Sequence, residues 1–177
     1  MKFKSLAVVK HPRDLVWKAM RDELPEMVPY LDEIEGISVQ SCRDEGSVRE
    51  IVNVWKAAPP IPRIVIKAIG TSLITWTDTA RWDNDTFVCR WVIEPELFKK
   101  FIVSEGSTTF VSAMGGRGTR ITFEGDIQFR GKKLPGIPVA VEGAIADGVN
   151  GFVQNLIPKN FRTLAAAVSK HLESRQA

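Results

Sequence analysis

The 177-residue chain has few of the residues that mark specialised protein classes. Its only cysteines are Cys42 and Cys89, so we expect reduced intracellular thiols and no disulfide framework. Its only histidines are His11 and His171, and neither has a cysteine, histidine or carboxylate at metal-ligand spacing. We therefore interpret both histidines as surface residues and expect neither a metal site nor a cofactor.

The chain also lacks a long apolar run and a strong excess of charge. No stretch approaches the roughly 18 to 20 apolar residues of a membrane-spanning helix, and the run at residues 6–9 is too short for a secretory signal. We therefore expect a soluble, cytoplasmic protein. Lys and Arg outnumber Asp and Glu by only 24 to 21 and are spread along the chain, so the sequence predicts no nucleic-acid partner.

What is present is the composition of an ordinary globular domain. Hydrophobic residues make up 44% of the chain and charged residues 25%, which excludes disordered, collagen-like and disulfide-scaffold classes. The length suits one domain, and the composition shows no break. We therefore predict a single domain over residues 1–177.

The first 32 residues predict one strand followed by two short helices. Residues 1–10 alternate with a period of two, which is typical of a strand ending at His11 and Pro12. Residues 12–24 carry an apolar helical stripe, and a second helix is predicted over residues 26–32. The stripe consists of Leu15, Val16, Ala19, Met20 and Leu24.

Between residues 37 and 130 the dominant period is two, broken by three turn signals, which predicts an antiparallel meander. The turn signals are Asp44, Glu45 and Gly46; Asp83, Asn84 and Asp85; and residues 115–118. The clearest strands are predicted over residues 73–82, 86–93 and 120–130. Residues 57–70 interrupt the meander with Pro59, Pro60 and Pro62, and this segment suits either a short amphipathic helix or an edge strand.

The last third of the chain predicts one long amphipathic helix over residues 141–173. Its stripe continues beyond Pro158, which should kink or break the helix because proline lacks an N–H group. The stripe consists of Val141, Ala144, Ile145, Gly148, Val149, Phe152, Val153, Leu156, Ile157, Phe161, Leu164, Ala165, Val168 and Leu172. A curved sheet with such a helix laid in its concavity buries both apolar faces together.

This order of elements resembles the START-like, or SRPBCC, helix-grip superfamily, which includes polyketide cyclases and lipid-transport domains. The resemblance covers residues 1–172 and also rests on local phrases at residues 61–67, 82–83, 116–119 and 138–142. It implies an α+β helix-grip fold, in which a curved antiparallel sheet wraps around the long C-terminal helix and two short helices follow the first strand. It further implies a cavity for a lipid, sterol, quinone, polyketide or other hydrophobic small molecule.

Several residues are candidates for the wall of that cavity because their position on a strand or on the helical stripe turns them inward. Three tryptophans occupy inward strand positions, and aromatic side chains either fill a core or line a pocket. Gly148 on the helical stripe leaves room either for a ligand or for close packing of a strand. The candidate ligand-binding residues are Trp55, Trp76, Asp78, Phe87, Trp91, Phe123, Ile127, Gly148, Val149, Phe152 and Leu156.

Asp78 is the exception among these residues because its strand neighbours on the same face are all apolar. A buried carboxylate needs a partner. Asp78 therefore either binds the polar end of a ligand, pairs with an arginine, or is turned to solvent by a bulge. Arg90 and Glu105 are weaker cases of the same kind, and we interpret both as solvated positions on the sheet.

Three functions fit this pattern. The first is a non-catalytic carrier or sensor of a hydrophobic small molecule; its cavity would open near residues 57–70 and Pro158, where Ile61, Ile64 and Ile66 could form an apolar lid or make transient contact with a membrane. The second is a cyclase or dehydratase-type enzyme with Asp78 or Glu105 as acid or base. The third is a protein-interaction module with an exposed apolar patch. The sequence sets no oligomeric state.

Overall fold

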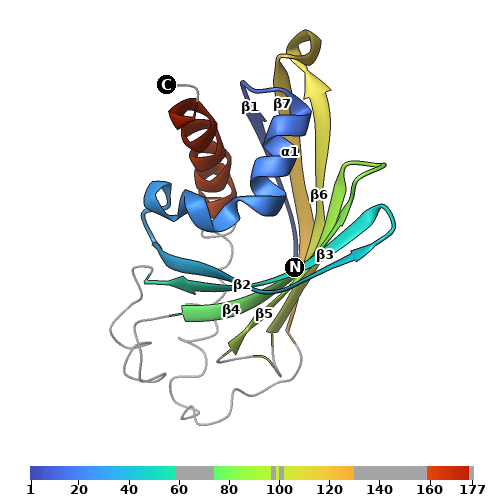
Figure 1. Cartoon of the computed structure of the whole chain (residues 1–177). Coiled ribbons are helices and arrows are strands. Elements are labelled where there is room, and N and C mark those ends of the chain that lie inside the picture. Colours follow the sequence, from blue (N-terminus) through green and yellow to red (C-terminus); the bar gives the residue numbers. More distant parts are fainter. Residues whose placement is uncertain (59–73, 97–98, 100–101, 130–158, 176–177) are drawn as a thin grey trace, which may run out of the picture.

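The computed structural model describes residues 1–58, 74–96, 99, 102–129 and 159–175. In chain order the elements are β1 (Lys2–Val9), α1 (Arg13–Asp22), the 3-10 helix η1 (Leu24–Tyr30), β2 (Ile34–Glu45), β3 (Val48–Ala57), β4 (Ile74–Asp83), β5 (Val88–Pro95), β6 (Ile102–Ala113), the 3-10 turn η3 (Met114–Gly116), β7 (Gly118–Phe129) and the C-terminal helix (residues 159–174). Figure 1 shows their arrangement. The predicted helix or strand at residues 57–70 and the part of the predicted long helix before residue 159 lie outside the described residues, apart from Ala57 and Ala58.

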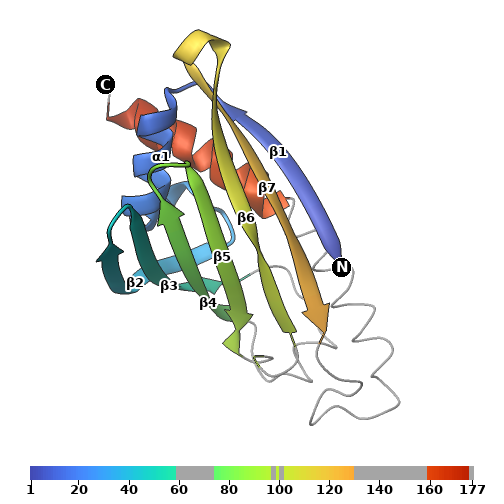
Figure 2. The ribbon, with the colours of Figure 1, turned by 90° about the vertical axis from the view of Figure 1, so that its right-hand side faces the viewer.

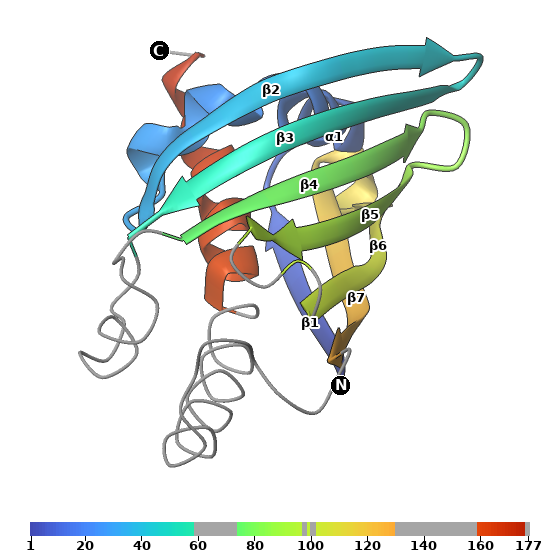
Figure 3. The ribbon, with the colours of Figure 1, turned by 90° about the horizontal axis from the view of Figure 1, so that it is seen from below.

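The described strands form one antiparallel sheet in the order β1-β7-β6-β5-β4-β3-β2. The sheet is curved, and α1, η1 and the C-terminal helix all lie on its inner side (Figures 2 and 3). Two register shifts in β2, at Ile34/Gly36 and at Val39/Ser41, are β-bulges of the kind that bend a strand. This arrangement confirms the predicted α+β fold, in which a curved antiparallel sheet packs against a C-terminal helix.

The turn signals of the sequence lie where the strands reverse. Gly46 separates β2 from β3 and adopts a φ of 63°, and Gly115 and Gly116 between β6 and β7 have φ values of 65° and 87°. Glycine is the residue that reaches this left-handed region without steric cost. Asn84 lies between β4 and β5, where its side-chain amide donates a hydrogen bond of 2.8 Å to the carbonyl of Ser47.

The core lies between the inner face of the sheet and the helices. Trp17 of α1 is at its centre and contacts Trp82 and Phe110 edge to face, with ring centroids 5.0 and 5.1 Å apart. Its Nε1 donates a hydrogen bond of 3.0 Å to Oδ1 of Asn84. These contacts fix the rotation of α1, and Leu15 is consequently 43% exposed, so its predicted inward position is wrong.

The apolar stripe of the C-terminal helix faces the sheet as predicted over residues 159–174. Phe161, Ala165, Val168 and Leu172 are buried, and Leu164 is partly buried against the core. A helix with one apolar stripe gains most of its stability from one-sided burial of this kind. The stripe therefore holds the helix against the inner face of the sheet.

The prediction that both histidines lie at the surface is wrong. His171 is 4% exposed, and its Nε2 lies 2.8 Å from Oε2 of Glu23, a residue that precedes η1. His11 is 7% exposed, and its carbonyl accepts a hydrogen bond of 2.7 Å from the hydroxyl of Thr119. Both histidines are buried because segments distant in the sequence pack over them.

Candidate functional site

A cavity of about 300 Å³ lies between the inner face of the sheet and the C-terminal helix. Its walls come from all seven strands, from Met20 of α1 and Leu24 of η1, from the segment that joins η1 to β2, and from residues 159–164 of the C-terminal helix. Most of these side chains are aliphatic or aromatic. Concave, mainly apolar sites with few polar groups are typical of small-molecule binding.

Two groups of stacked aromatic rings form much of the wall. Trp55 and Trp76, cross-strand neighbours on β3 and β4, stack with ring centroids 5.6 Å apart and an interplanar angle of 14°. Trp91, Phe123 and Phe161 form a second stack, with centroid distances of 4.7 and 4.9 Å. This second stack joins β5 and β7 to the C-terminal helix, so the helix and the sheet share one aromatic wall.

Two glycines allow Trp91 to lie flat against the sheet. Gly106 and Gly125 pair with each other on β6 and β7, and they separate Trp91 on β5 from Phe3 on β1. A Cβ atom would lie 2.5 Å from Trp91 Cζ2 if placed on Gly106, and 2.6 Å from Trp91 Cη2 if placed on Gly125. The indole can therefore cross β6 only because these positions carry no side chain. Its Nε1 donates a hydrogen bond of 3.2 Å to the hydroxyl of Thr108.

Asp78 lies on the inner face of the sheet and lines the cavity. Strand β4 pairs with β3 and β5 without a register shift at this residue, so no bulge turns it to solvent. Burial raises the pKa of Asp78 to about 7 from its ordinary 3.8, although the neighbouring side chains of Trp55 and Asn53 favour the ionised form. Its buried Oδ1 makes no hydrogen bond within the part of the chain that the structure describes.

Other polar atoms around the cavity are buried and lack a hydrogen bond to any described residue. They are Nε1 of Trp55, Nε1 of Trp82, Oγ of Ser104 and Oε2 of Glu33. Oδ1 of Asn53, the residue paired with Asp78 across the strands, is also buried without a hydrogen bond to a described residue. Buried polar atoms are nearly always satisfied in folded proteins. Their concentration around one cavity is the pattern expected where water or a ligand supplies the missing partner.

One edge of the cavity carries its only paired charges among the described residues. Lys159, at the start of the described part of the C-terminal helix, forms an ion pair of 2.5 Å with Oε1 of Glu33. Asp32, Asn160 and Thr163 also line this edge. The polar residues thus gather at one side, while the opposite walls are apolar apart from Asp78 and the small polar residues of β6.

The structure brings together six of the predicted site residues and leaves one apart. Trp55, Trp76, Asp78, Trp91, Phe123 and Ile127 all line the cavity. Phe87 does not, because it lies in the turn before β5 with a φ of 54° and packs on Trp17 and under the guanidinium of Arg13, contrary to the predicted inward strand position. The remaining candidates, Gly148, Val149, Phe152 and Leu156, lie outside the described residues.

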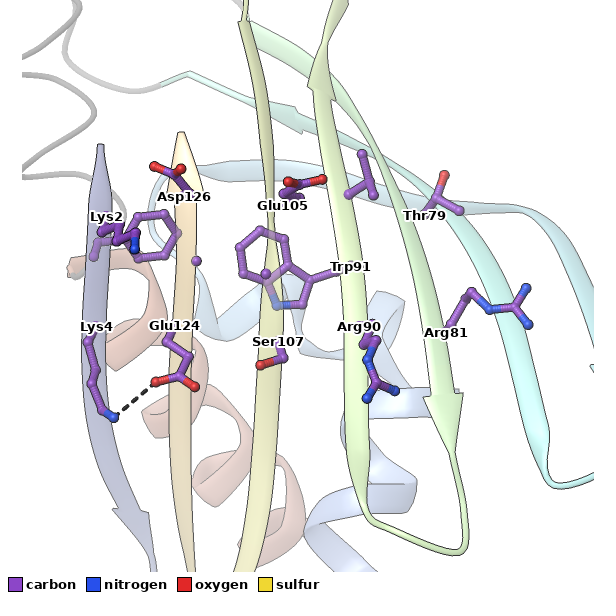
Figure 4. Close-up of a pocket in the computed structure, with 14 residues that line it drawn as sticks. Lys2, Lys4, Thr79, Arg81, Arg90, Trp91, Glu105, Ser107, Glu124 and Asp126 are labelled. Carbon is purple, nitrogen blue, oxygen red and sulfur yellow. Dashed lines mark ion pairs between the residues drawn. The ribbon is translucent and has the colours of Figure 1, made fainter. Parts of the chain in front are cut away.

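Arg90 and Glu105, which the sequence predicts to be solvated, lie on the outer face of the sheet, opposite the cavity. Arg90 and Glu105 are exposed, and Oε1 of Glu105 accepts a hydrogen bond of 3.1 Å from Gln128. Both line an open groove of about 900 Å³ over the outer face, where β1 carries lysines, β6 and β7 carry acidic residues, and β4 and β5 carry arginines (Figure 4). Lys4 and Glu124 form an ion pair of 2.9 Å there, and such exposed pairs contribute little energy. Because Glu105 faces away from the cavity, the hypothesis that it acts there as acid or base is wrong.

Sequence reasoning missed several residues that line the cavity. Ser104 and Thr108 line it from inward positions on β6, and Gly106 lies between them, so the small or polar side chains of this strand hide the alternation that marks the other strands. Cys89 also lines the cavity, and burial raises the pKa of its thiol well above the ordinary value, with a further contribution from Asp78. Cys42 is exposed, and the two thiols are unpaired as predicted.

Glu23, Glu26 and His171 form a cluster whose potential ligand atoms lie within 4.8 Å of one another. Arg175 already pairs with Oε2 of Glu23 at 2.5 Å, and hydrogen bonds from Arg175 and His171 hold the pKa of Glu23 below its ordinary value. We interpret the cluster as an ion-pair network that fastens the C-terminal helix to the start of η1.

No protein-family model matches the sequence, and no curated protein matches it. Solved structures do match. The structure titled TTHA0849, from Thermus thermophilus, is 20% identical with a TM-score of 0.70, and the match covers 100% of both chains. The Zhui aromatase/cyclase from Streptomyces sp. R1128 is 14% identical with a TM-score of 0.65 over 100% of this chain and 96% of that one. A START superfamily protein from Mycobacterium smegmatis is 15% identical with a TM-score of 0.55, covering 98% and 97%.

These identities are low, so the likeness concerns the fold. Among the helices of the described residues, none is long and apolar enough to cross a membrane. The sheet order, the two short helices after β1 and the C-terminal helix on the inner face are those of a helix-grip fold, and the aromatase/cyclase and the START superfamily protein match this chain over nearly its whole length. The chain therefore has the START-like, helix-grip fold.

Proposed function

We propose that the chain binds a hydrophobic small molecule, of lipid, sterol, quinone or polyketide-like character, in the cavity, and acts as its carrier or sensor. The observation that carries this proposal is the largely apolar cavity of about 300 Å³ in which Asp78 has a buried oxygen without a hydrogen bond to any described residue. Each 100 Å² of apolar ligand surface removed from water contributes about 2.5 kcal/mol toward binding. The stacked aromatic walls supply such surface without rearrangement.

The first test is native mass spectrometry of the purified protein, followed by extraction and identification of any bound small molecule. The second is calorimetric titration with 1-naphthylmethanol, a small neutral aromatic compound. Ile93 lines the cavity, and Ile93→Trp should fill part of it and weaken binding about tenfold or more. The matched control is Val92→Trp on the exposed face of the same strand, which should bind like the parent. Equal binding by both variants would contradict the proposal.

A second candidate function is an enzyme of the cyclase or dehydratase type, and within the chain a single residue, Asp78, supports it. A carboxyl group with a pKa of about 7 inside a cavity is suited to accept or donate a proton at neutral pH. Two of the similar solved structures are aromatase/cyclases. An enzyme of this cyclase or dehydratase type would lose turnover in an Asp78→Asn variant that still binds substrate, whereas a carrier would show no turnover to lose.

An interaction module receives less support. Leu6, Val8 and Val111 are exposed on the outer face, but the strand register places Arg120 between Val8 and Val111. Exposed apolar residues interrupted by charge in this way are normal for a protein surface.

A further inference from the structure

The surroundings of Asp78 in the cavity bear on the charge of the ligand. Asp78 belongs to the row Asn53, Asp78, Ile93 and Ser104, which runs across β3, β4, β5 and β6 on the inner face. Its direct cross-strand neighbours are Asn53 and Ile93, neither of which carries a charge. A carboxylate in this position lacks the positive partner that a buried charge normally requires.

No described residue inside the cavity supplies that positive charge. Lys159 is the only lysine or arginine among the described lining residues, and it is paired with Glu33 at the polar edge. Asp32, Glu33 and Asp78 are the acidic residues of the lining, so acidic groups exceed basic groups by three to one. The electrostatic balance of the lining therefore favours a positively charged guest over a neutral or negative one.

The aromatic residues near Asp78 also favour binding of a cation. Trp55 lies beside Asp78, and its ring stacks against that of Trp76. Trp82 lies two inward positions beyond Asp78 on the same strand and lines the same cavity. The faces of indole rings attract organic cations, most strongly where water is excluded. In addition, Oδ1 of Asp78 and Oδ1 of Asn53 are acceptors without a donor among the described residues, and an ammonium group carries donors that both can accept. The unpaired N–H groups of Trp55 and Trp82 need an acceptor that the ammonium group does not supply, and that role falls to water.

We propose that the ligand of this cavity is a hydrophobic amine, whose protonated nitrogen pairs with Asp78 among the tryptophans while its apolar body lies against the Trp91, Phe123 and Phe161 stack. This inference rests on the proposed binding function and specifies the chemical class of the ligand. It distinguishes Asp78, which would bind the cation, from Glu33, whose charge is already matched by Lys159.

The experiment compares three compounds that share one ring and differ in charge: 1-naphthylmethylamine, 1-naphthylmethanol and 1-naphthoic acid. Calorimetric titrations of the full chain at pH 8 should show the amine binding at least about tenfold more tightly than the alcohol, because a hydrogen bond to a charged group contributes more than a neutral one. The acid should bind most weakly. In Asp78→Asn the amine should lose its advantage while the alcohol still binds.

The matched control is Glu105→Gln, which removes the same charge from the outer face of the sheet and should keep the preference for the amine. If the alcohol binds as tightly as the amine to the parent protein, or if Asp78→Asn keeps the preference, the inference is overturned while the binding function stands. If none of the three compounds binds and the purified protein carries no small molecule, the binding function itself fails.

Discussion

Replacing Asp78 by asparagine should stabilise the protein at alkaline pH. In the folded protein the Asp78 carboxyl has a pKa of about 7, whereas its ordinary value is 3.8. By linkage, this difference corresponds to about 4 kcal/mol of unfolding free energy that is lost when the carboxyl must ionise inside the cavity. Asparagine has nearly the same shape and does not ionise, so the variant avoids this cost.

The sign of the effect follows from the direction of the change in pKa. Because the pKa is raised on folding, the folded state binds more protons than the unfolded state between about pH 4 and pH 7, and stability falls as the pH rises through this window. About 2 kcal/mol of the cost is present at pH 5, and about 2 to 3 kcal/mol more is added by pH 8. The stability of Asp78→Asn relative to the parent should therefore increase by about 2 to 3 kcal/mol between these two pH values.

The assay is urea denaturation of both proteins at pH 5 and pH 8, followed by circular dichroism. In a thermal scan the same difference amounts to roughly 5–10 °C for a chain of this size. Comparing the variant with the parent at each pH cancels the contributions of other carboxyl groups such as Glu23, whose pKa is lowered. A difference between the two proteins that does not change with pH would refute the argument, because it would mean that Asp78 ionises as freely when folded as when unfolded.

Two further predictions concern the aromatic wall and the thiols. Gly106→Ala should destabilise the protein by about 1–3 kcal/mol in urea denaturation, since the added Cβ would lie 2.2 Å from the backbone oxygen of Glu124 and 2.5 Å from the Trp91 ring, whereas an unchanged midpoint would mean that both the β7 backbone and the ring move aside freely. Cys42 should react with a thiol reagent within the first phase of labelling, and Cys89 only at the rate of opening or unfolding, because it is buried and its pKa is raised. Equal reaction of both thiols in the native protein would contradict the burial of Cys89.

The sequence was sufficient to predict those parts of the fold whose pattern is local. The inward positions of β4 follow from a two-residue alternation that includes Trp76, Asp78 and Trp82, and the structure has all three lining the cavity. The stripe of the C-terminal helix likewise repeats over a few residues, and its described part packs as the spacing predicts. Local periodicity predicts which face of a helix or strand is buried, and for this reason it identified most of the residues of β4 and the C-terminal helix that line the cavity or the core.

Features that depend on distant partners were beyond such reasoning. His171 is buried where its Nε2 shares a hydrogen bond with Glu23, which lies 148 residues earlier in the chain, and no spacing reveals such a pair. Phe87 leaves the strand pattern because it adopts a left-handed turn conformation just before β5 begins. Strand β6 carries Ser104 and Gly106 on its inner face instead of the usual large apolar residues. Gly106 leaves room for the Trp91 ring, and the small Ser104 leaves room for the cavity, so neither position shows the apolar alternation of a buried strand.

The positions of the tryptophans should make the intrinsic fluorescence of the protein sensitive to ligand binding. Trp55, Trp76, Trp82 and Trp91 line the cavity, whereas Trp17 does not line it and is held in the core by its bond to Asn84. A guest that enters the cavity should therefore change the intrinsic emission through these four of the five tryptophans in the sequence, and Trp17 should respond only through its contact with Trp82. Occupancy can thus be followed by ultraviolet fluorescence without attaching any dye.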